Sequence, residues 1–458
     1  MNPELLLAPE LTLVGDRFER DLTVGVDPAT GLITRVLPKS EIGHATPLPR
    51  RALVPGFVNV HSHSFQRAIR GRTEHRTGAE FDTFWTWREK MYHVAQSLTP
   101  EDIHDVARMA FLEMTLAGIT AVGEFHYLHH QPDGTPYADP VETAKAILAA
   151  ATSIGIRIVL LQCGYTRGGF DRPMHPGQRR FCTPDPDVFC ANLETLRAQA
   201  SVGVAPHSFR AVPLEYAKRL HVYAQQHALP FHMHISEQPR ENAETLAEHG
   251  ETPINLLARE TMLDRRFTAI HAVHITAAEV DELAVAEASV GACPTTERNL
   301  GDGIIRADRL FSRGVSICFG SDSQIQIDPL EDARAMEYHL RLDRLERVAL
   351  ADLHDTRETA LASRLWQSAT ESGARSLGLE SGVIRAGAMA DFFTIDLDDV
   401  SIADAEDDSL ISSIVFSLER TAIRDVWVAG RPVVQERHHP LASEIVGRFQ
   451  KLQRRLWK

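Results

Sequence analysis

Residues 54–64 read Val-Pro-Gly-Phe-Val-Asn-Val-His-Ser-His-Ser, an apolar run that ends in two histidines one residue apart, His61 and His63. Valine and phenylalanine at this density favour a buried strand. Alternate side chains of a strand share a face, so both imidazoles project to the same side at the strand's end. Two histidines in a strand are at least as often hydrogen-bonded core residues as ligands, and the chain contains 22 histidines. The pair is therefore a candidate metal chelate whose other ligands must come from later in the chain.

After residue 54, short apolar strands alternate with amphipathic helices, which is typical of β/α units with parallel strands. The helices have recognisable ends: Thr99-Pro100-Glu101 opens one that stops at Gly118, and Asp139-Pro140 opens another that stops at Gly155. Eight strands are predicted, over residues 57–61, 120–126, 157–162, 201–207, 230–235, 268–273, 290–294 and 316–322.

Eight β/α units are the number in a closed (β/α)₈ barrel. We therefore expect an α/β fold with a TIM-like barrel over residues 55–379. Residues 1–54 and 380–458 read as short strands and turns, apart from a short terminal helix. The simplest arrangement pairs both chain ends in one small composite β-sandwich domain beside the barrel.

Composition narrows the classes of partner. The net charge of −14 is spread along the chain without a Lys/Arg block, which argues against nucleic acid or an anionic membrane as a partner. Five cysteines with no C-x-x-C spacing predict reduced thiols in a cytoplasm rather than a disulfide framework. The N-terminus has no basic region before its short apolar run, so we expect no export signal. A small-molecule substrate is the expected partner.

Polar residues that buried strands rarely tolerate lie at the predicted strand ends, where barrel enzymes build their active sites. His234 ends the fifth strand, His271 lies in the sixth, and Asp322 follows the eighth. His61, His63, His234 and Asp322 offer three imidazoles and a carboxylate that suit Zn²⁺, although iron or manganese uses the same donors. A structural zinc site would favour a cysteine-rich closed shell, so catalysis is the better interpretation.

A hydrolytic metal site also needs groups that move protons. Glu237 stands three residues after His234 in an H-x-x-E motif, where it is placed to protonate a leaving or neighbouring nitrogen. Asp322 and His271 flank the expected water and can accept its proton.

Four further residues lie just beyond strand ends, where they could hold a substrate or be ordinary loop residues: Gln66, Tyr127, His207 and Arg210. Four other histidines are expected to be packing or supporting groups rather than ligands: His129, His130, His232 and His274. The long aromatic segment 72–98 predicts a helical insertion in which Phe84 and Trp85 pack on the barrel. A lid over the site is the alternative.

These motifs resemble those of metal-dependent deaminases of the amidohydrolase superfamily, over essentially the full length of the chain. The superfamily-wide features are PGFVNVHSH at 55–63, the H-x-x-E motif, the histidine of the sixth strand and GSDS at 320–323. More particular motifs resemble the formimidoylglutamate deiminases of histidine degradation: SFQRAIRG at 64–71, FWTWREKMY at 84–92, EFHYLHH at 124–130, HSFRAV at 207–212 and CPTTERNLGDGI at 293–304.

The resemblance implies hydrolysis of N-formimino-L-glutamate to N-formyl-L-glutamate and ammonia by a homodimer. It implies Zn²⁺ held by His61, His63, His234 and Asp322, proton transfer by Glu237, His271 and Asp322, and substrate contacts from Gln66, Arg88, Tyr127, His207 and Arg210. Two carboxylates on the substrate match two arginines. Related two-metal barrels carry a bridging carboxylated lysine on the fourth strand, and residues 201–207 contain no lysine, so one metal ion is expected.

Two alternatives stay open. The nearer is another amidohydrolase deaminase that acts on an aminated heterocycle such as guanine, cytosine or adenosine. The other is a noncatalytic barrel protein, which the full set of ligands disfavours.

Overall fold

The computed structural model describes residues 4–458, so residues 1–3 of the predicted terminal domain lie outside the described residues. Eight parallel strands form one sheet in chain order. They are β6 (Phe57–Ser62), β7 (Ile119–His126), β8 (Arg157–Gly164), β9 (Val202–Pro206), β10 (Phe231–Ile235), β11 (Phe267–His271), β12 (Ser289–Ala292) and β13 (Ser316–Phe319). Beyond the last strand, the backbone N–H of Asp322 donates to the carbonyl of His61 at 2.9 Å, which joins the two ends of the sheet. The predicted TIM-like barrel is confirmed.

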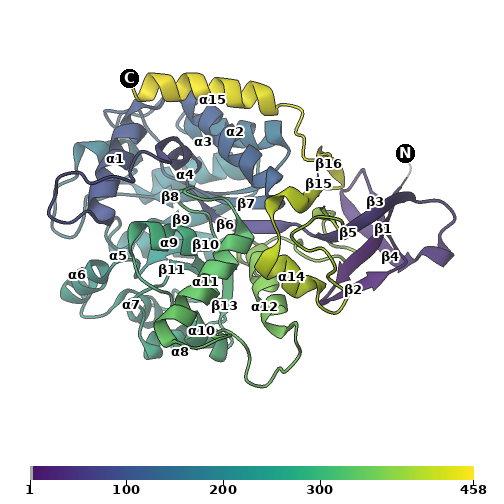
Figure 1. Ribbon diagram of the computed structural model, residues 1–458. Coiled ribbons are helices and arrows are strands. Elements are labelled where there is room, and N and C mark those ends of the chain that lie inside the picture. The colour runs from purple at the N-terminus through teal and green to yellow at the C-terminus, as the bar shows by residue number, and fades with distance from the viewer. Residues whose placement is uncertain (1–3) are drawn as a thin grey trace.

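Helices surround this barrel (Figure 1). They are α1 (Phe84–Ser97), α2 (Pro100–Leu116), α3 (Glu142–Ile154), α4 (Pro186–Arg197), α5 (Leu214–Gln226), α6 (Pro239–His249), α7 (Pro253–Arg259), α8 (Ala277–Val285), α9 (Pro294–Leu300), α10 (Ala307–Ser312), α11 (Pro329–Arg344), α12 (Ala360–Ala369), α13 (Glu371–Ser376), α14 (Leu410–Ser417) and α15 (Ala442–Leu456). Short 3₁₀ helices are η1 (Lys39–Glu41), η2 (Ser64–Ile69), η3 (Pro176–Phe181) and η4 (Arg420–Ala422).

Local sequence sets the helix ends. Thr99 caps α2 by accepting from the N–H of Asp102, whose side chain accepts in return from the N–H of Thr99. Gly155 ends α3 with a φ of +84°, a conformation that glycine adopts without strain. Both helices therefore begin and end close to the predicted positions.

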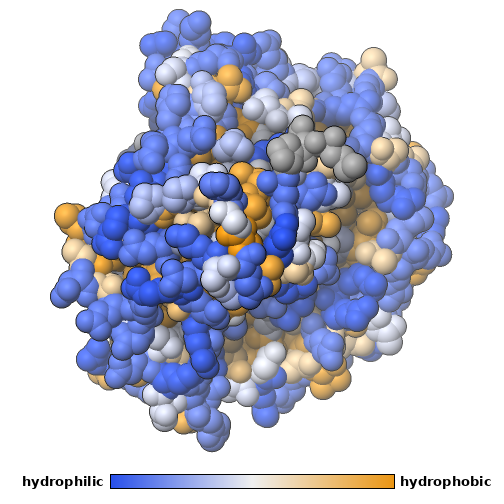
Figure 2. Space-filling model, turned by 90° about the vertical axis from the view of Figure 1, so that its right-hand side faces the viewer, coloured by the Kyte–Doolittle hydropathy of each residue, from blue (hydrophilic) through white to orange (hydrophobic). Residues whose placement is uncertain are grey.

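Strands from both chain ends form a separate mixed sheet. Its strands are β1 (Leu5–Val14), β2 (Arg17–Arg20), β3 (Leu22–Asp27), β4 (Leu32–Pro38), β5 (Thr46–Pro55), β14 (Phe392–Asp396), β15 (Ile423–Val428) and β16 (Arg431–Val434). β5 pairs with β1 on one side and with β14 on the other, which joins the N-terminal and C-terminal segments. Leu7, Val24, Phe392 and Trp427 contribute to a hydrophobic cluster of this sheet. The surface at this end of the molecule is mostly hydrophilic, with a short hydrophobic strip near its centre (Figure 2).

The chain passes from the mixed sheet into the barrel at Gly56, between β5 and β6. A Cβ at this position would lie 2.1 Å from Oγ1 of Thr120, so only glycine fits beside β7. At the other end of the chain, α15 packs across α2 (Figure 1), where Arg448 forms an ion pair with Asp105 at 2.8 Å. Among residues 4–458, no helix combines the length and apolar character needed to cross a membrane.

Candidate active site

Four predicted ligands converge at the C-terminal mouth of the barrel. Nε2 of His234, on β10, lies 3.1 Å from Nε2 of His61 and 3.4 Å from Nε2 of His63. Oδ1 of Asp322 lies 3.4 Å from Nε2 of both His61 and His63. All four side chains are buried. Residues more than 250 positions apart in the chain thus present their donor atoms to one point.

Hydrogen bonds define the protonation of two of these imidazoles. Nδ1 of His63 lies 2.9 Å from the carbonyl oxygen of Phe125, and Nδ1 of His234 lies 2.9 Å from that of His207. A carbonyl oxygen only accepts, so both Nδ1 atoms carry the proton and both Nε2 atoms keep a free lone pair. Burial lowers the pKa of His61 to about 3 and lowers the pKa of His63 and His234 as well, which keeps the three rings neutral.

The donor set fits a divalent cation. Lone pairs of neutral imidazoles at 3.1–3.4 Å from one another repel unless a positive charge lies between them. The carboxylate of Asp322 completes an N₃O set of the kind that binds catalytic zinc. Burial opposes ionisation of Asp322, but its contacts with His61, His271 and His63 hold the pKa of this carboxyl below its ordinary value. An ionised carboxylate and three neutral rings are the protonation states that a metal requires.

The glycine of the GSDS motif allows β6 and the segment after β13 to approach closely. A Cβ on Gly320 would lie 2.6 Å from the Cβ of His61 and 2.9 Å from its carbonyl oxygen. With glycine there, the N–H of Asp322 reaches the carbonyl of His61, and the N–H of His63 donates to the carbonyl of Asp322 at 3.1 Å. Backbone pairing therefore sets the distance between the ligands of the two strands.

The predicted proton-transfer groups lie beside the ligands. Nε2 of His271, at the end of β11, lies 3.9 Å from Oδ2 of Asp322 and 3.9 Å from Oε1 of Glu237. Burial opposes the charged ring, but the carboxylates of Glu237, Glu297 and Asp322 outweigh it and raise the pKa of His271 to about 10. A proton held on His271 lies within reach of both carboxylates.

Glu297, on α9, was not singled out from the sequence, although it lies in the CPTTERNLGDGI motif. Its Oε1 is 3.3 Å from Nδ1 of His271 and accepts from the N–H of Cys293 at 2.8 Å. The only local signal is a buried glutamate in the first turn of a short helix, which is an ordinary capping pattern.

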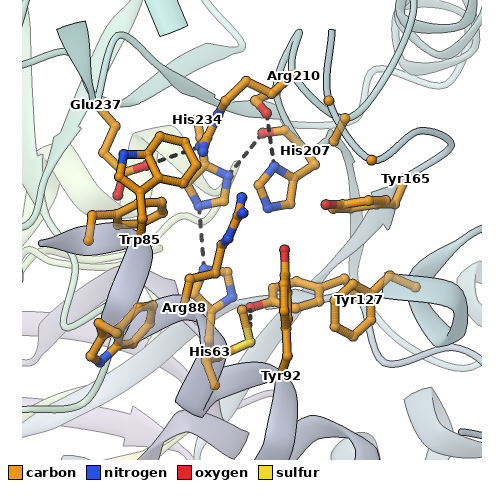
Figure 3. Close-up of a pocket in the computed structure, with 18 of the residues that line it drawn as sticks. His63, Trp85, Arg88, Tyr92, Tyr127, Tyr165, His207, Arg210, His234 and Glu237 are labelled. Atoms are coloured by element: carbon orange, nitrogen blue, oxygen red, sulfur yellow. Dashed lines mark hydrogen bonds and ion pairs between the residues drawn. The ribbon is translucent and has the colours of Figure 1, made fainter. Parts of the chain in front are cut away.

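All five predicted substrate-binding residues line one pocket of about 780 Å³, part of it open to solvent, together with His63, His234, Glu237, His271 and Asp322. Nε2 of Gln66 donates to the hydroxyl of Tyr127 at 3.0 Å. Arg88, on α1, extends its guanidinium into the centre of the pocket toward His207 (Figure 3). Its Cζ lies 4.6 Å from the ring centroid of Trp85, and its Nε has no hydrogen-bond partner among the described residues.

Arg210 faces the same pocket from the loop after β9 (Figure 3). Its Nη2 donates to Oε2 of Glu237 at 3.1 Å, and its Nε lies 3.9 Å from Oε2 of Glu241. Arg88 and Arg210 thus reach one cavity from two separate elements. Such an arrangement can bind two carboxylates, or both ends of one elongated anion.

The helical insertion expected over residues 72–98 is present as α1, and Phe84 and Trp85 line the pocket in addition to any packing on the barrel. Thr83 caps the start of α1, and Cζ of Arg210 lies 5.9 Å from the ring centroid of Trp85. Tyr92 and Tyr165 also line the pocket and were missed. A tyrosine that directly follows a strand, as Tyr165 follows β8, was the available signal.

The four histidines expected to be supporting groups donate hydrogen bonds to backbone carbonyls. His129, His130, His232 and His274 each place Nε2 2.7–3.0 Å from a backbone carbonyl, on Cys163, Cys182, Ser376 and Asp302 respectively. The five cysteines are all free.

A model of the amidohydrolase family matches residues 52–433. A curated formimidoylglutamate deiminase from Pseudomonas aeruginosa is 38% identical over 437 residues, which cover 94% of each chain. A 5-methylthioadenosine/S-adenosylhomocysteine deaminase from Natronomonas pharaonis is 26% identical over 94% of this chain and 91% of its own length. The crystal structure of an amidohydrolase from Brucella melitensis superimposes with a TM-score of 0.90 at 33% identity, covering 99% of this chain and 100% of that one.

Proposed function

The chain belongs to the amidohydrolase family, a family of metal-dependent hydrolases, and we propose that it hydrolyses N-formimino-L-glutamate to N-formyl-L-glutamate and ammonia. Water adds to the formimino carbon, the bond from that carbon to its terminal nitrogen breaks, and the nitrogen leaves as ammonia. The pocket supplies the three components that this reaction needs: a metal site, proton-transfer groups and recognition of carboxylates.

The observation that carries this proposal is the position of Arg88 and Arg210 in the pocket of the His/Asp cluster. Arg210 already pairs with Glu237, but Arg88 has no carboxylate partner among the described residues, and a partly buried guanidinium beside a metal site is unfavourable unless an anion neutralises it. A glutamate derivative brings two carboxylates, whereas a purine or pyrimidine brings none. The relative from Pseudomonas aeruginosa, at 38% identity, supports the same substrate.

We propose that His61, His63, His234 and Asp322 hold one divalent cation, with zinc the first choice for three imidazoles and a carboxylate. When bound, such an ion lowers the pKa of water toward neutrality and polarises the C=N bond. The neutral rings and the ionised carboxylate described above are the states that support this role.

The chain's own residues then move the protons. The carboxylate of Asp322 accepts the proton of the attacking water, and the proton that His271 already holds, 3.9 Å from the carboxylates of Asp322 and Glu237, passes to Glu237. Glu237 delivers a proton to the formimino nitrogen, and its ion pair with Arg210 at 3.1 Å orients its carboxylate. Gln66, Tyr127 and His207 line the remaining wall and donate hydrogen bonds to the substrate.

The test is ammonia release by the zinc-loaded protein, offered N-formimino-L-glutamate in parallel with guanine, cytosine, adenosine and 5-methylthioadenosine. His61→Ala is the control for contaminating activity. Release from formiminoglutamate alone, abolished in the control, supports the proposal. Release from a heterocycle alone would contradict the assignment of Arg88 and Arg210 while keeping the metal and proton-transfer roles.

The resemblance of the chain to this enzyme class also supports a homodimer that works in the cytoplasm, where reduced thiols agree with five free cysteines. Light scattering of the purified protein measures its oligomeric state.

A further inference from the structure

Glu124, at the C-terminal part of β7, is a buried carboxylate with no assigned role. Its Oε2 accepts from Oγ of Ser62 at 2.5 Å, and its Oε1 accepts from both N and Oγ of Ser64, at 2.8 and 2.6 Å. Ser62 and Ser64 are the residues on either side of His63. Three hydrogen bonds donated to one carboxylate therefore hold the residues that flank this predicted ligand.

The same contacts extend to Asp322 on the other side of the barrel closure. Oγ of Ser62 accepts from Nε2 of Gln324 at 2.9 Å, and that nitrogen also donates to the carbonyl of Asp322 at 2.9 Å. Oε1 of Gln324 in turn accepts from Oγ of Ser321 at 2.9 Å. Glu124 and Gln324 thus connect Ser62 and Ser64 with Ser321 of the GSDS motif in one buried network.

This network lies where the backbone is strained. Asp322 has a φ of +43° and Gln324 a φ of +61°, a region that residues other than glycine rarely adopt. Such conformations persist only where surrounding contacts over-determine them. The hydrogen bonds of Gln324 to Ser62 and to the carbonyl of Asp322 supply that restraint.

Glu124 has no cationic partner to offset its burial. Among residues 4–458, no arginine or lysine forms an ion pair with it, and its side chain is 2% exposed. An unpaired buried carboxylate is unfavourable, and only its three donors compensate for the lost hydration. A neutral amide at this position keeps one acceptor oxygen, which can serve Ser64, but replaces the other oxygen with an NH2 group that cannot accept from Ser62.

We propose that Glu124 is a positioning residue for the metal site: through Ser62 and Ser64 it orients His63, and through Ser62 and Gln324 it holds Asp322. The donor atoms of these two ligands then converge before the ion binds. The proposal rests on the metal role given to His63 and Asp322 in the proposed function, and is independent of the identity of the substrate.

The experiment measures the zinc dissociation constant of Glu124→Gln by competition with a chromophoric chelator. Removing a group that orients a ligand typically weakens metal binding about 10–100-fold, and we expect a loss in that range. The matched control is Glu337→Gln on α11. Glu337 is also a buried carboxylate, and it accepts from the N–H groups of Ala349 and Leu350, both at 2.9 Å.

Thermal unfolding of the metal-free proteins separates positioning from general stability. We expect both variants to unfold at a lower temperature than the wild type, and only Glu124→Gln to bind zinc more weakly. Ser64→Ala, which removes one of the three donors, should show a smaller loss of zinc affinity and serves if Glu124→Gln does not fold.

Unchanged zinc affinity in Glu124→Gln overturns the proposal. If that variant does not fold, unchanged zinc affinity in Ser64→Ala overturns it instead. A loss of zinc affinity in Glu337→Gln equal to that in Glu124→Gln also overturns it. If the wild type binds zinc but does not release ammonia from formiminoglutamate, the proposed substrate fails. The zinc titrations then still decide the role of Glu124.

Discussion

Nη2 of Arg210 donates to Oε2 of Glu237 at 3.1 Å, which joins a candidate carboxylate-binding residue to the candidate proton donor. Both side chains are largely buried, with 11% of Arg210 and 5% of Glu237 exposed, so each charge depends on the other as a partner. A substrate carboxylate that binds Arg210 therefore changes the surroundings of the group that protonates the leaving nitrogen. This ion pair therefore couples substrate binding to proton transfer.

Arg210→Met is expected to lower kcat as well as raise KM, because it removes a substrate contact and leaves Glu237 buried without its partner. Breaking a buried charge pair costs about 2–5 kcal/mol, which corresponds to at least about a 30-fold loss in kcat/KM. Arg88→Met is the matched comparison, since no carboxylate pairs with Arg88 among the described residues, and it should act mainly on KM. Equal effects on kcat in steady-state assays would contradict this difference.

Glu237→Gln should retain zinc and substrate affinity but lower kcat by about 10²–10⁴-fold, the usual contribution of a positioned proton donor. The amide is nearly isosteric and still accepts one hydrogen bond from Arg210, but it transfers no proton. Mass spectrometry measures the zinc content of the variant, and single-turnover rates measure its loss of catalysis. Full turnover in a variant with normal zinc content would remove Glu237 from the proposed mechanism.

Glu241 predicts a pH-dependent stability. Burial raises the pKa of this carboxyl to about 7 from an ordinary value of 4.5. The folded state therefore holds the Glu241 proton more tightly than the unfolded state does. Binding of this proton stabilises the fold fully below pH 4.5, and that stabilisation is lost as the pH rises to about 7. Glu241→Gln lacks this loss, so its unfolding free energy should exceed that of the wild type by up to about 3 kcal/mol above pH 7.

Thermal unfolding of Glu241→Gln and the wild type at pH 5 and pH 8 checks this prediction. The difference in Tm should be larger at pH 8. An identical difference at the two pH values would mean that the carboxyl does not titrate in this window.

Gly320→Ala should disrupt the metal site, because the new Cβ would lie 2.6 Å from the Cβ of His61. Relief of this overlap must move β6 away from Asp322, and overpacking of this kind costs about 1–3 kcal/mol. We expect a lower Tm and substoichiometric zinc. Gly43→Ala is the control, since no heavy atom lies within 4 Å of its added Cβ. Zinc binding equal to that of the wild type in Gly320→Ala would contradict the close-approach argument.

Much of the fold could be predicted because its signals are local. The alternation of apolar strands with capped helices can be recognised in short stretches of consecutive residues. Eight such strands predict a barrel, at whose C-terminal mouth lie His61, His63, His234, His271 and Asp322. The boundaries proposed at residues 54/55 and 379/380 between barrel and terminal domain stay a prediction, as do the individual roles of the site residues.

The sequence by itself determined which residues lie at or just beyond the ends of the barrel strands, to within a few positions, because strand periodicity and turn residues act over short distances. Only the tertiary structure decided their partners: Glu124 with Ser62, 62 residues away, and Arg210 with Glu237, 27 residues away. It also decided that Phe84 and Trp85 line the pocket rather than only pack on the barrel. No periodicity links such pairs, since each contact depends on how the whole barrel closes and on which buried charges must find a partner there.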